Sequence, residues 1–175
     1  LVVYTGSRSG HTHNHAKRLF RSALAELIPC AVECGVVLAV EPMHAGCASA
    51  WTFLTDLDET LEMIQSVDSP QVKLLFDAYH LGHVPNIADR LPELAHWIAL
   101  VQLGDARVPP RGEQNRCRLG AGTLPLRAIV AALVRNGYAG DLDIELMGED
   151  MENPDYAELI ADSRRVACEW LRDGA

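Results

Sequence analysis

The sequence predicts one α/β domain, in which a parallel sheet is covered by helices on its outside. Three observations support this fold class. Five short apolar runs alternate with five stretches of helical periodicity along the 175 residues. No linker or shift of composition divides the chain. Hydrophobic residues make up 49% of the sequence, which is enough to bury the core of one domain of this size.

The strands are predicted from apolar runs that end in a turn residue or an acid. The clearest run is Val72–Asp77, with turn signals at Ser69-Pro70 before it and at Gly82 after it. Its almost unbroken apolar sequence is typical of a strand that is buried on both faces. The other strands are predicted at 1–4, 36–40, 97–103 and 142–146.

The helices are predicted from apolar residues that recur three and four positions apart. Pro29 lies inside the first helical stretch and predicts a kink or an early end there. Thr55 is the predicted N-cap of the second helix, and Asn153 is the predicted N-cap of the last, followed by Pro154 at its first position. The predicted helices cover about 15–34, 56–67, 87–94, 123–135 and 154–171.

The composition argues against several classes of partner. A formal net charge of -9 disfavours a nucleic-acid backbone or an anionic membrane surface as the main partner. No apolar run approaches the ~20 residues of a membrane span, and no signal segment opens the sequence. The five cysteines are odd in number and include no Cys-x-x-Cys pair, which indicates reduced thiols in a cytoplasmic protein. No glycine-rich nucleotide motif follows a strand. The oligomeric state, a homo-oligomer included, stays open.

Four polar residues stand at the C-terminal limits of four successive apolar runs: Glu41, Asp77, Gln102 and Glu145. Neighbouring parallel strands lie ~4.8 Å apart, so these strand ends can converge on one ion. Three carboxylates so close would repel each other, and a divalent cation removes that cost. Carboxylate and amide oxygens suit Mg²⁺ or Mn²⁺ better than Zn²⁺. A set of unrelated capping acids is the alternative, and the recurrence after four strands disfavours it.

The alternation of strands and helices leaves two architectures open, a doubly wound sheet and an eight-stranded barrel. The order and spacing of four stretches resemble the xylose isomerase-like barrels, which include sugar phosphate isomerases and epimerases. The stretches are Val40-Glu41-Pro42-Met43-His44, Phe76-Asp77-Ala78-Tyr79-His80, Val101-Gln102-Leu103-Gly104-Asp105 and Asp143-Ile144-Glu145. The resemblance implies a (β/α)8 TIM-barrel type of fold, in which residues 1–175 form a single domain with the last five βα units. Since the sequence opens at Leu1 without a methionine and enters a strand at once, we expect the domain to be N-terminally incomplete.

The resemblance also implies a site. Its metal ligands would be Glu41, Asp77, Gln102 and Glu145, with Mn²⁺ or Mg²⁺ as the ion. Glu41 and Glu145 would be the catalytic residues that move protons, and His80 would contact the substrate. Most members of the family have histidine where this chain has Gln102, which leaves the identity of the metal open.

Side chains in neighbouring loops are also expected to contact the substrate. His44 would bind a substrate hydroxyl, with a hydrogen-bonded loop histidine as the alternative. Arg107 follows the third ligand strand, where the family often places a substrate-binding arginine. Arg111, Arg116 and Arg118 of the same loop would either grip a phosphate or carboxylate or lie in an exposed, solvated loop, which is the commoner outcome.

The predicted function is that of a divalent-metal-dependent sugar or polyol isomerase/epimerase. The metal would polarise the carbonyl group of the substrate, while one glutamate takes a proton from the adjacent carbon and the other returns it. An inosose dehydratase-like lyase on the same scaffold, a non-catalytic fragment and an abasic-site endonuclease are the alternatives. The endonuclease would need a histidine-rich multi-zinc site and a basic groove, and the strand ends and net charge offer neither.

Overall fold

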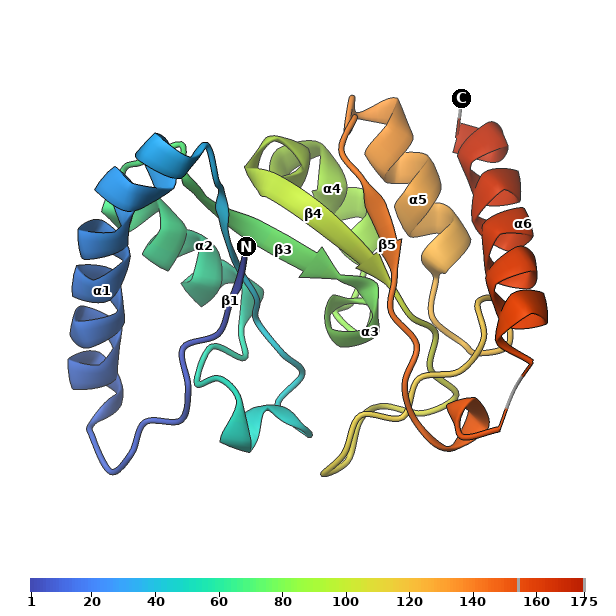
Figure 1. Cartoon of the computed structure of the whole chain (residues 1–175), viewed down its shortest axis with the longest axis horizontal. Helices are drawn as coiled ribbons and strands as arrows, with labels where there is room; N and C mark the ends of the chain where they lie inside the picture. The colour runs from blue at the N-terminus through green and yellow to red at the C-terminus, as the bar shows by residue number, and fades with distance from the viewer. Residues whose placement is uncertain (154, 175) are drawn as a thin grey trace.

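The chain folds around one parallel sheet of five strands (Figure 1). The computed structural model describes residues 1–153 and 155–174. Its strands are β1 Val2–Val3, β2 Leu38–Val40, β3 Val72–Asp77, β4 Ile98–Leu103 and β5 Leu142–Ile144. Each strand pairs with the strand that follows it in the chain, whereas a doubly wound sheet reverses its order at a switch point. The strand order is therefore that of a β/α barrel.

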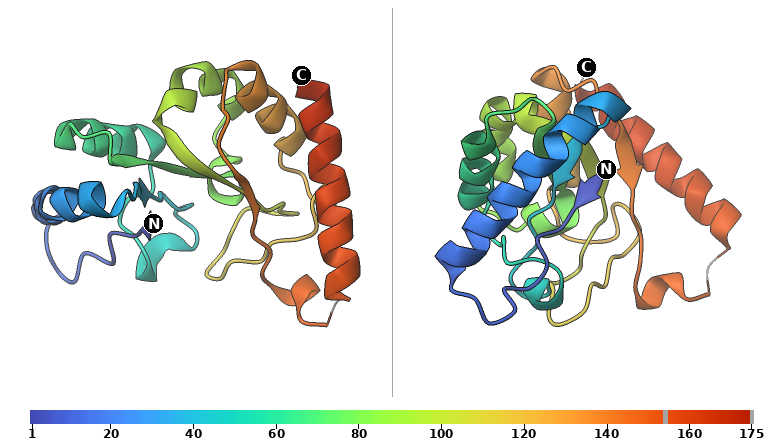
Figure 2. Two further views of the ribbon diagram at one scale, coloured as in Figure 1. Left: turned by 45° about the horizontal axis from the view of Figure 1, so that its top comes forward. Right: turned by 60° about the vertical axis from the view of Figure 1, so that its left-hand side comes forward.

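The helices lie in an arc around the outside of the strands, in chain order from α1 to α6 (Figure 2, left). Helix α1 packs against α2, and α5 packs against both α4 and α6. The loops that follow β1, β2, β4 and β5 gather at the lower edge of Figure 1, which is the edge where barrels build their active sites. The helices are α1 His13–Cys34, α2 Leu57–Val67, α3 Ala78–Leu81, α4 Ile87–Leu94, α5 Leu126–Arg135 and α6 Tyr156–Gly174, with 3-10 helices η1 Ala48–Ala50, η2 Ala95–Trp97 and η3 Glu149–Met151.

The core lies between the sheet and the helices. Strand β3 is buried at every residue except Lys73, as its sequence predicts for a strand covered on both faces. Because side chains two positions apart share a face, Val72, Leu74 and Phe76 are the residues of β3 that pack toward the helices. Helix α5 buries residues that recur three and four positions apart, as an amphipathic helix does: Leu126, Ile129, Val130 and Leu133.

The predicted start of α2 is wrong, and of the two outcomes predicted at Pro29, a kink or an early end, the early end is not seen. The N-cap of α2 is Asp56, not Thr55, because the side chain of Asp56 accepts a hydrogen bond from the N–H of Glu59 at 2.9 Å. Both residue types are good caps, so two adjacent candidates could not be separated from sequence. Pro29 does not end α1, which continues to Cys34. Pro29 lies on an exposed part of α1, where water can satisfy the carbonyl that proline leaves without an N–H partner.

The predicted cap of the last helix is also wrong. The side chain of Asp155 accepts hydrogen bonds from the N–H groups of Ala157 at 2.9 Å and Glu158 at 3.2 Å. Asp155 therefore caps α6 in place of Asn153. The predicted first helical residue, Pro154, lies outside the described residues.

None of the helices in the described part of the chain is long and apolar enough to cross a membrane. None of the five cysteines forms a disulfide in the structure.

Candidate active site

The four predicted strand-end residues lie on one face and at one edge of the sheet. In sequence, each is the neighbour of a strand residue that packs with the hydrophobic core: Val40, Phe76, Leu103 and Ile144. Neighbouring residues of a strand point to opposite faces, so the strand-end residues point to the inner face, away from the helices. Asp77 pairs with Gln102 in register, and the N–H of Glu145 donates to the carbonyl of Leu103. The inner-face set at this edge is Glu41, Asp77, Gln102 and Glu145.

Glu41, Asp77 and His80 form a buried cluster at this edge, with at most 2% of each residue exposed. Asp77 caps the one-turn helix α3, and its Oδ1 accepts a hydrogen bond from the N–H of Tyr79 at 2.8 Å. The turn brings His80 back to the strand end, where its Nε2 lies 3.7 Å from Oε1 of Glu41 and 3.7 Å from Oδ2 of Asp77. One donor atom from each of the three residues lies within 4.8 Å of the others, which makes them a candidate metal triad.

Three buried atoms of the site that could bind a metal have no hydrogen-bond partner among the described residues, Oε2 of Glu41, Oε1 of Gln102 and Nε2 of His80, and Nε of Arg116 beside them has none either. A buried polar atom without a partner costs free energy, so these atoms mark a place for a ligand. Carboxylate and amide oxygens and an imidazole nitrogen are all donors that divalent cations accept. The residues present therefore fit a divalent cation.

Burial and charge together shift the ionisable groups of the site. Burial, followed by the nearby Asp77 carboxylate, raises the pKa of Glu41 to about 8, while a hydrogen bond with Tyr4 acts in the opposite direction. Burial also raises the pKa of Glu145. Burial lowers the pKa of His80 to about 4, so this imidazole is neutral at neutral pH. A neutral imidazole keeps a lone pair that can bind a metal or accept a hydrogen bond from a hydroxyl.

Arg116 lies in the same cluster with 1% of its surface exposed, so the interpretation of an exposed loop arginine is wrong for this residue. Its Nη1 and Nη2 donate to the two oxygens of Asp77 at 3.0 and 2.6 Å. Nη2 also lies 3.2 Å from Oε2 of Glu145, and the guanidinium carbon lies 4.5 Å from the centre of the Tyr79 ring. Burial opposes its charge, but Asp77 and the two glutamates outweigh burial and raise the pKa of Arg116.

The loop that carries Arg116 is held by Asp105, at the end of β4. Asp105 is 2% exposed. Its two oxygens accept hydrogen bonds at 2.8 to 3.2 Å from four backbone N–H groups, those of Ala106, Gly120, Gly122 and Leu124. This carboxylate thus ties the start of the loop to its end, and the return of the chain brings Arg116 to the strand ends. No local sequence pattern signals that return.

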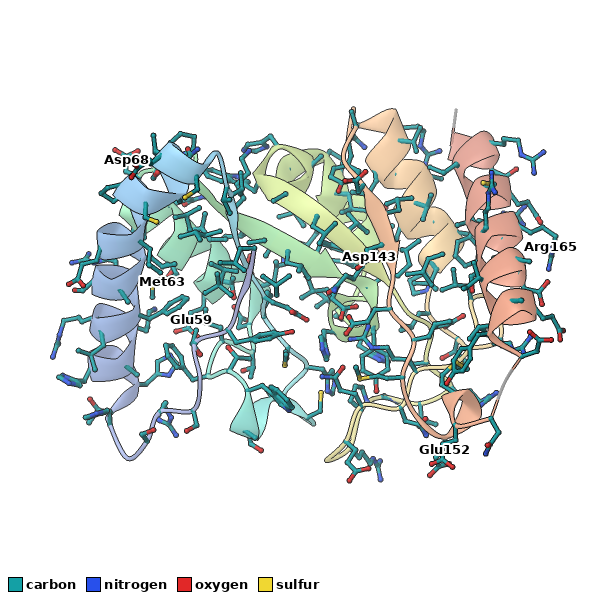
Figure 3. All side chains as sticks on the ribbon, in the orientation of Figure 1. Glu59, Met63, Asp68, Asp143, Glu152 and Arg165 are labelled. Carbon is teal, nitrogen blue, oxygen red and sulfur yellow. The ribbon has the colours of Figure 1, made fainter. Side chains whose placement is uncertain are left out.

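The other predicted substrate residues lie beside the cluster. His44 is half-buried, with its ring centre 5.2 Å from that of His83, and burial lowers the pKa of both histidines. Arg107 is exposed and lines a cavity of about 560 Å³ between its own loop and η3. Glu152, at the lower edge of Figure 3, lines the same cavity. The structure thus brings His80 into the cluster and leaves Arg107 at a neighbouring cavity.

A sequence model described as xylose isomerase-like TIM barrel matches residues 1–173. The chain belongs to this family. The match includes all five strands and every residue of the cluster, and it agrees with a strand order that never reverses. The fold class predicted from the sequence is confirmed.

Two relatives of this xylose isomerase-like chain are sugar epimerases by name. D-psicose 3-epimerase of Enterocloster bolteae is 30% identical over 118 residues, which cover 67% of this chain and 36% of the relative. L-ribulose-5-phosphate 3-epimerase UlaE of Shigella flexneri is 24% identical over 160 residues, which cover 91% of this chain and 51% of the relative. The chain therefore spans about half or less of the length of these relatives.

Solved structures share the fold. Protein SMc04130 from Sinorhizobium meliloti 1021 has a TM-score of 0.84 at 24% identity, over 97% of this chain and 63% of that one. The IOLI protein, whose crystal structure holds a zinc atom, has a TM-score of 0.81 at 19% identity, over 99% of this chain and 62% of that one. At these identities the likeness concerns the fold alone.

Proposed function

We propose that this chain carries the active site of a divalent-metal-dependent sugar or polyol epimerase or isomerase. The observation that carries the proposal is the buried inner-face cluster at the C-terminal edge of the strands, with unsatisfied atoms on Glu41, Gln102 and His80. Active sites of β/α barrels are built at this edge. The names of the two relatives support a small-molecule sugar as the substrate. We further propose that residues 1–175 form the part of one barrel domain that carries this site.

The proposed metal ligands are Glu41, Asp77, Gln102 and Glu145. Their oxygen-rich donor set favours Mn²⁺ or Mg²⁺, and the zinc atom of the IOLI structure makes Zn²⁺ the ion to compare with them. A cation held there would supply Lewis-acid polarisation of the substrate's carbonyl group and stabilise the negative charge that develops beside it. His80 lies against two of these ligands, and we assign it to the substrate because its neutral ring can accept a hydroxyl hydrogen bond.

Glu41 and Glu145 are the proposed proton-transfer residues. They follow β2 and β5, with β3 and β4 between them, so they approach the site from two sides. One takes the proton from the carbon next to the carbonyl, and the other returns a proton to the opposite face of that carbon, which inverts it. In the ion-free site burial raises the pKa of Glu41 to about 8, and a bound cation would lower it from there, toward the neutral range in which a general base works best.

The remaining substrate contacts are proposed from position. His44 lies close enough to His80 to lower its pKa slightly and can bind a substrate hydroxyl. Arg107 is the proposed substrate contact in the neighbouring cavity of about 560 Å³, whose lining carries both charges, with Arg111 beside Glu113, Glu149 and Glu152. One of the two relatives is named for an unphosphorylated sugar and the other for a phosphorylated sugar, so the test should use both kinds of substrate.

The test is hydrogen exchange between substrate and solvent. The protein, saturated with Mn²⁺, is incubated in D₂O with D-psicose or with L-ribulose 5-phosphate, and loss of the C3 proton is followed by NMR. We expect exchange and formation of the C3 epimer with at least one sugar. Glu41→Gln and Glu145→Gln should each abolish exchange, whereas Glu93→Gln, at an exposed position of α4, should leave it unchanged.

The outcomes separate the alternatives. Normal exchange in Glu41→Gln or in Glu145→Gln would remove that glutamate from the proton-transfer role. Release of water from a cyclic polyol, without epimer formation, would indicate the dehydratase-like lyase. Absence of exchange with every sugar in a folded, Mn²⁺-bound protein would indicate a non-catalytic member of the family.

A further inference from the structure

The guanidinium of Arg116 is built into the strand-end cluster by its surroundings. Tyr79 covers its face at 4.5 Å, and Oε1 of Gln114 accepts a hydrogen bond from Nη2 at 2.9 Å. Gly104 leaves the space that the arginine fills, because an added Cβ would lie 2.9 Å from both Cδ and Nη1 of Arg116. The N–H of Arg116 donates to the carbonyl of Met147 at 2.7 Å, which ties its backbone to the segment after β5. The partners of Nη1, Nη2, the ring face and the backbone thus hold the guanidinium in one orientation, while its buried Nε has no hydrogen-bond partner among the described residues.

That orientation constrains Asp77. A carboxylate offers about four acceptor positions. On Asp77, Oδ1 accepts from the N–H of Tyr79 and from Nη1 of Arg116, and Oδ2 accepts from Nη2 of Arg116. One acceptor position remains, on Oδ2, the oxygen that lies 3.7 Å from Nε2 of His80. The fork of the arginine therefore fixes the carboxylate so that its remaining lone pair belongs to the cluster.

The charges of the cluster also support a bound cation. Glu41, Asp77 and Glu145 bring three carboxylates to one edge of the sheet, and Arg116 brings one buried cation. With all three carboxylates ionised, the cluster has an excess of two negative charges, which one divalent cation would neutralise. Nη2 of Arg116 is shared by Asp77 at 2.6 Å and Glu145 at 3.2 Å, so a single group ties together ligands that come from β3 and β5.

We infer that Arg116 is a positioning residue of the metal site: its bidentate guanidinium fork orients Asp77 toward the ion, and its ion pair with Glu145 holds that carboxylate beside it. The inference rests on the proposed metal site. Groups that hold metal ligands from behind typically change metal affinity by about 10- to 100-fold when they are replaced. A lysine at this position keeps the charge but provides a single point of contact, so Asp77 would lose its fixed orientation.

The experiment compares Arg116→Lys with Arg118→Lys in the full-length protein. Arg118 lies two residues further along the same loop and pairs with exposed acids of α6, at 3.4 Å from Asp162 and 3.8 Å from Glu158. Mn²⁺ affinity is measured by calorimetry, and the ligand geometry is monitored by the visible spectrum of the Co²⁺-loaded protein. We expect Arg116→Lys to bind Mn²⁺ about 10- to 100-fold more weakly, with a changed Co²⁺ spectrum. Arg118→Lys should match the wild type in both.

A second variant covers the case in which Arg116→Lys does not fold. Tyr79→Leu removes the ring that covers the guanidinium and leaves every charge of the cluster in place. It should weaken Mn²⁺ binding several-fold and shift the Co²⁺ spectrum in the same direction. Wild-type affinity and spectrum in either folded variant, beside a wild-type protein that binds Mn²⁺, would overturn the inference alone. A wild-type protein that binds no divalent ion would overturn the proposed metal site and the inference with it.

Discussion

The replacement Glu41→Gln should abolish a specific pH dependence of the stability of the metal-free protein. In the folded state Glu41 keeps its proton up to about pH 8, whereas in the unfolded chain it loses the proton near its ordinary value of 4.5. Between these values the folded state binds one more proton, so the free energy of unfolding falls by about 1.4 kcal/mol per pH unit. The contribution is present at low pH and is lost as pH rises through the folded pKa.

The window for this measurement is set by His80. Its folded pKa is about 4 and its ordinary value 6.5, so below pH 6.5 the unfolded chain binds the extra proton and the slope has the opposite sign. From pH 6.5 to pH 8 only the effect of Glu41 remains of the two, and it amounts to about 2 kcal/mol. Glu145, whose pKa is also raised by burial, is present in both proteins, so any contribution from it cancels in the comparison.

The assay is urea unfolding in the presence of EDTA at pH 6.5 and pH 8. The wild type should lose about 2 kcal/mol more than Glu41→Gln across this interval, because glutamine has no proton to lose. Addition of excess Mn²⁺ at pH 8 should restore the free energy of unfolding that the wild type has lost, since a nearby positive charge favours the ionised carboxylate. Parallel losses in the two proteins would show that the ionised form of Glu41 is not penalised by burial, and the reasoning about its pKa would be refuted.

Two further substitutions test the parts of the site. His80→Ala should raise KM about tenfold, a cost of about 1.4 kcal/mol, because we assign His80 to the substrate. The Mn²⁺ dissociation constant should stay within about twofold of the wild-type value. Weaker Mn²⁺ binding with an unchanged KM would instead make His80 a metal ligand. Asp105→Ala should lower the free energy of unfolding by about 3 kcal/mol or more, since four backbone N–H groups lose a buried carboxylate acceptor. The matched control is Asp143→Ala, at an exposed position of β5, and equal urea midpoints for the two variants would contradict the loop-holding role of Asp105.

The elements of the fold could be predicted because their signals are local. An apolar run such as Val72–Phe76 and the spacing of Leu126, Ile129 and Leu133 depend only on near neighbours in sequence. The order of the strands could not be predicted in this way, since a doubly wound sheet and a barrel use the same local pattern. The N-cap of α2 was predicted one residue too early, because Thr55 and Asp56 are both good caps and their types alone do not separate them.

Some residues of the candidate site could likewise be predicted from local sequence, and others could not. Glu41, Asp77, Gln102 and Glu145 could be placed together because each is a strand-end residue and the strands are parallel. Arg116 could not, because its place depends on a loop of about twenty residues that is closed by Asp105 at its start. The sequence showed four arginines in that loop, and the structure distributes them: Arg116 enters the cluster, Arg107 and Arg111 line the cavity, and Arg118 pairs with α6.

The most direct test of the central claim is to locate a divalent ion by anomalous X-ray scattering in crystals of the protein grown with Mn²⁺. The account predicts one Mn²⁺ peak at the C-terminal edge of the strands, contacted by oxygens of Glu41, Asp77, Gln102 and Glu145, with Arg116 still bound to Asp77 behind it. A peak elsewhere, for example among His11, His13 and His15 at the start of α1, with no peak between these four residues, would contradict it.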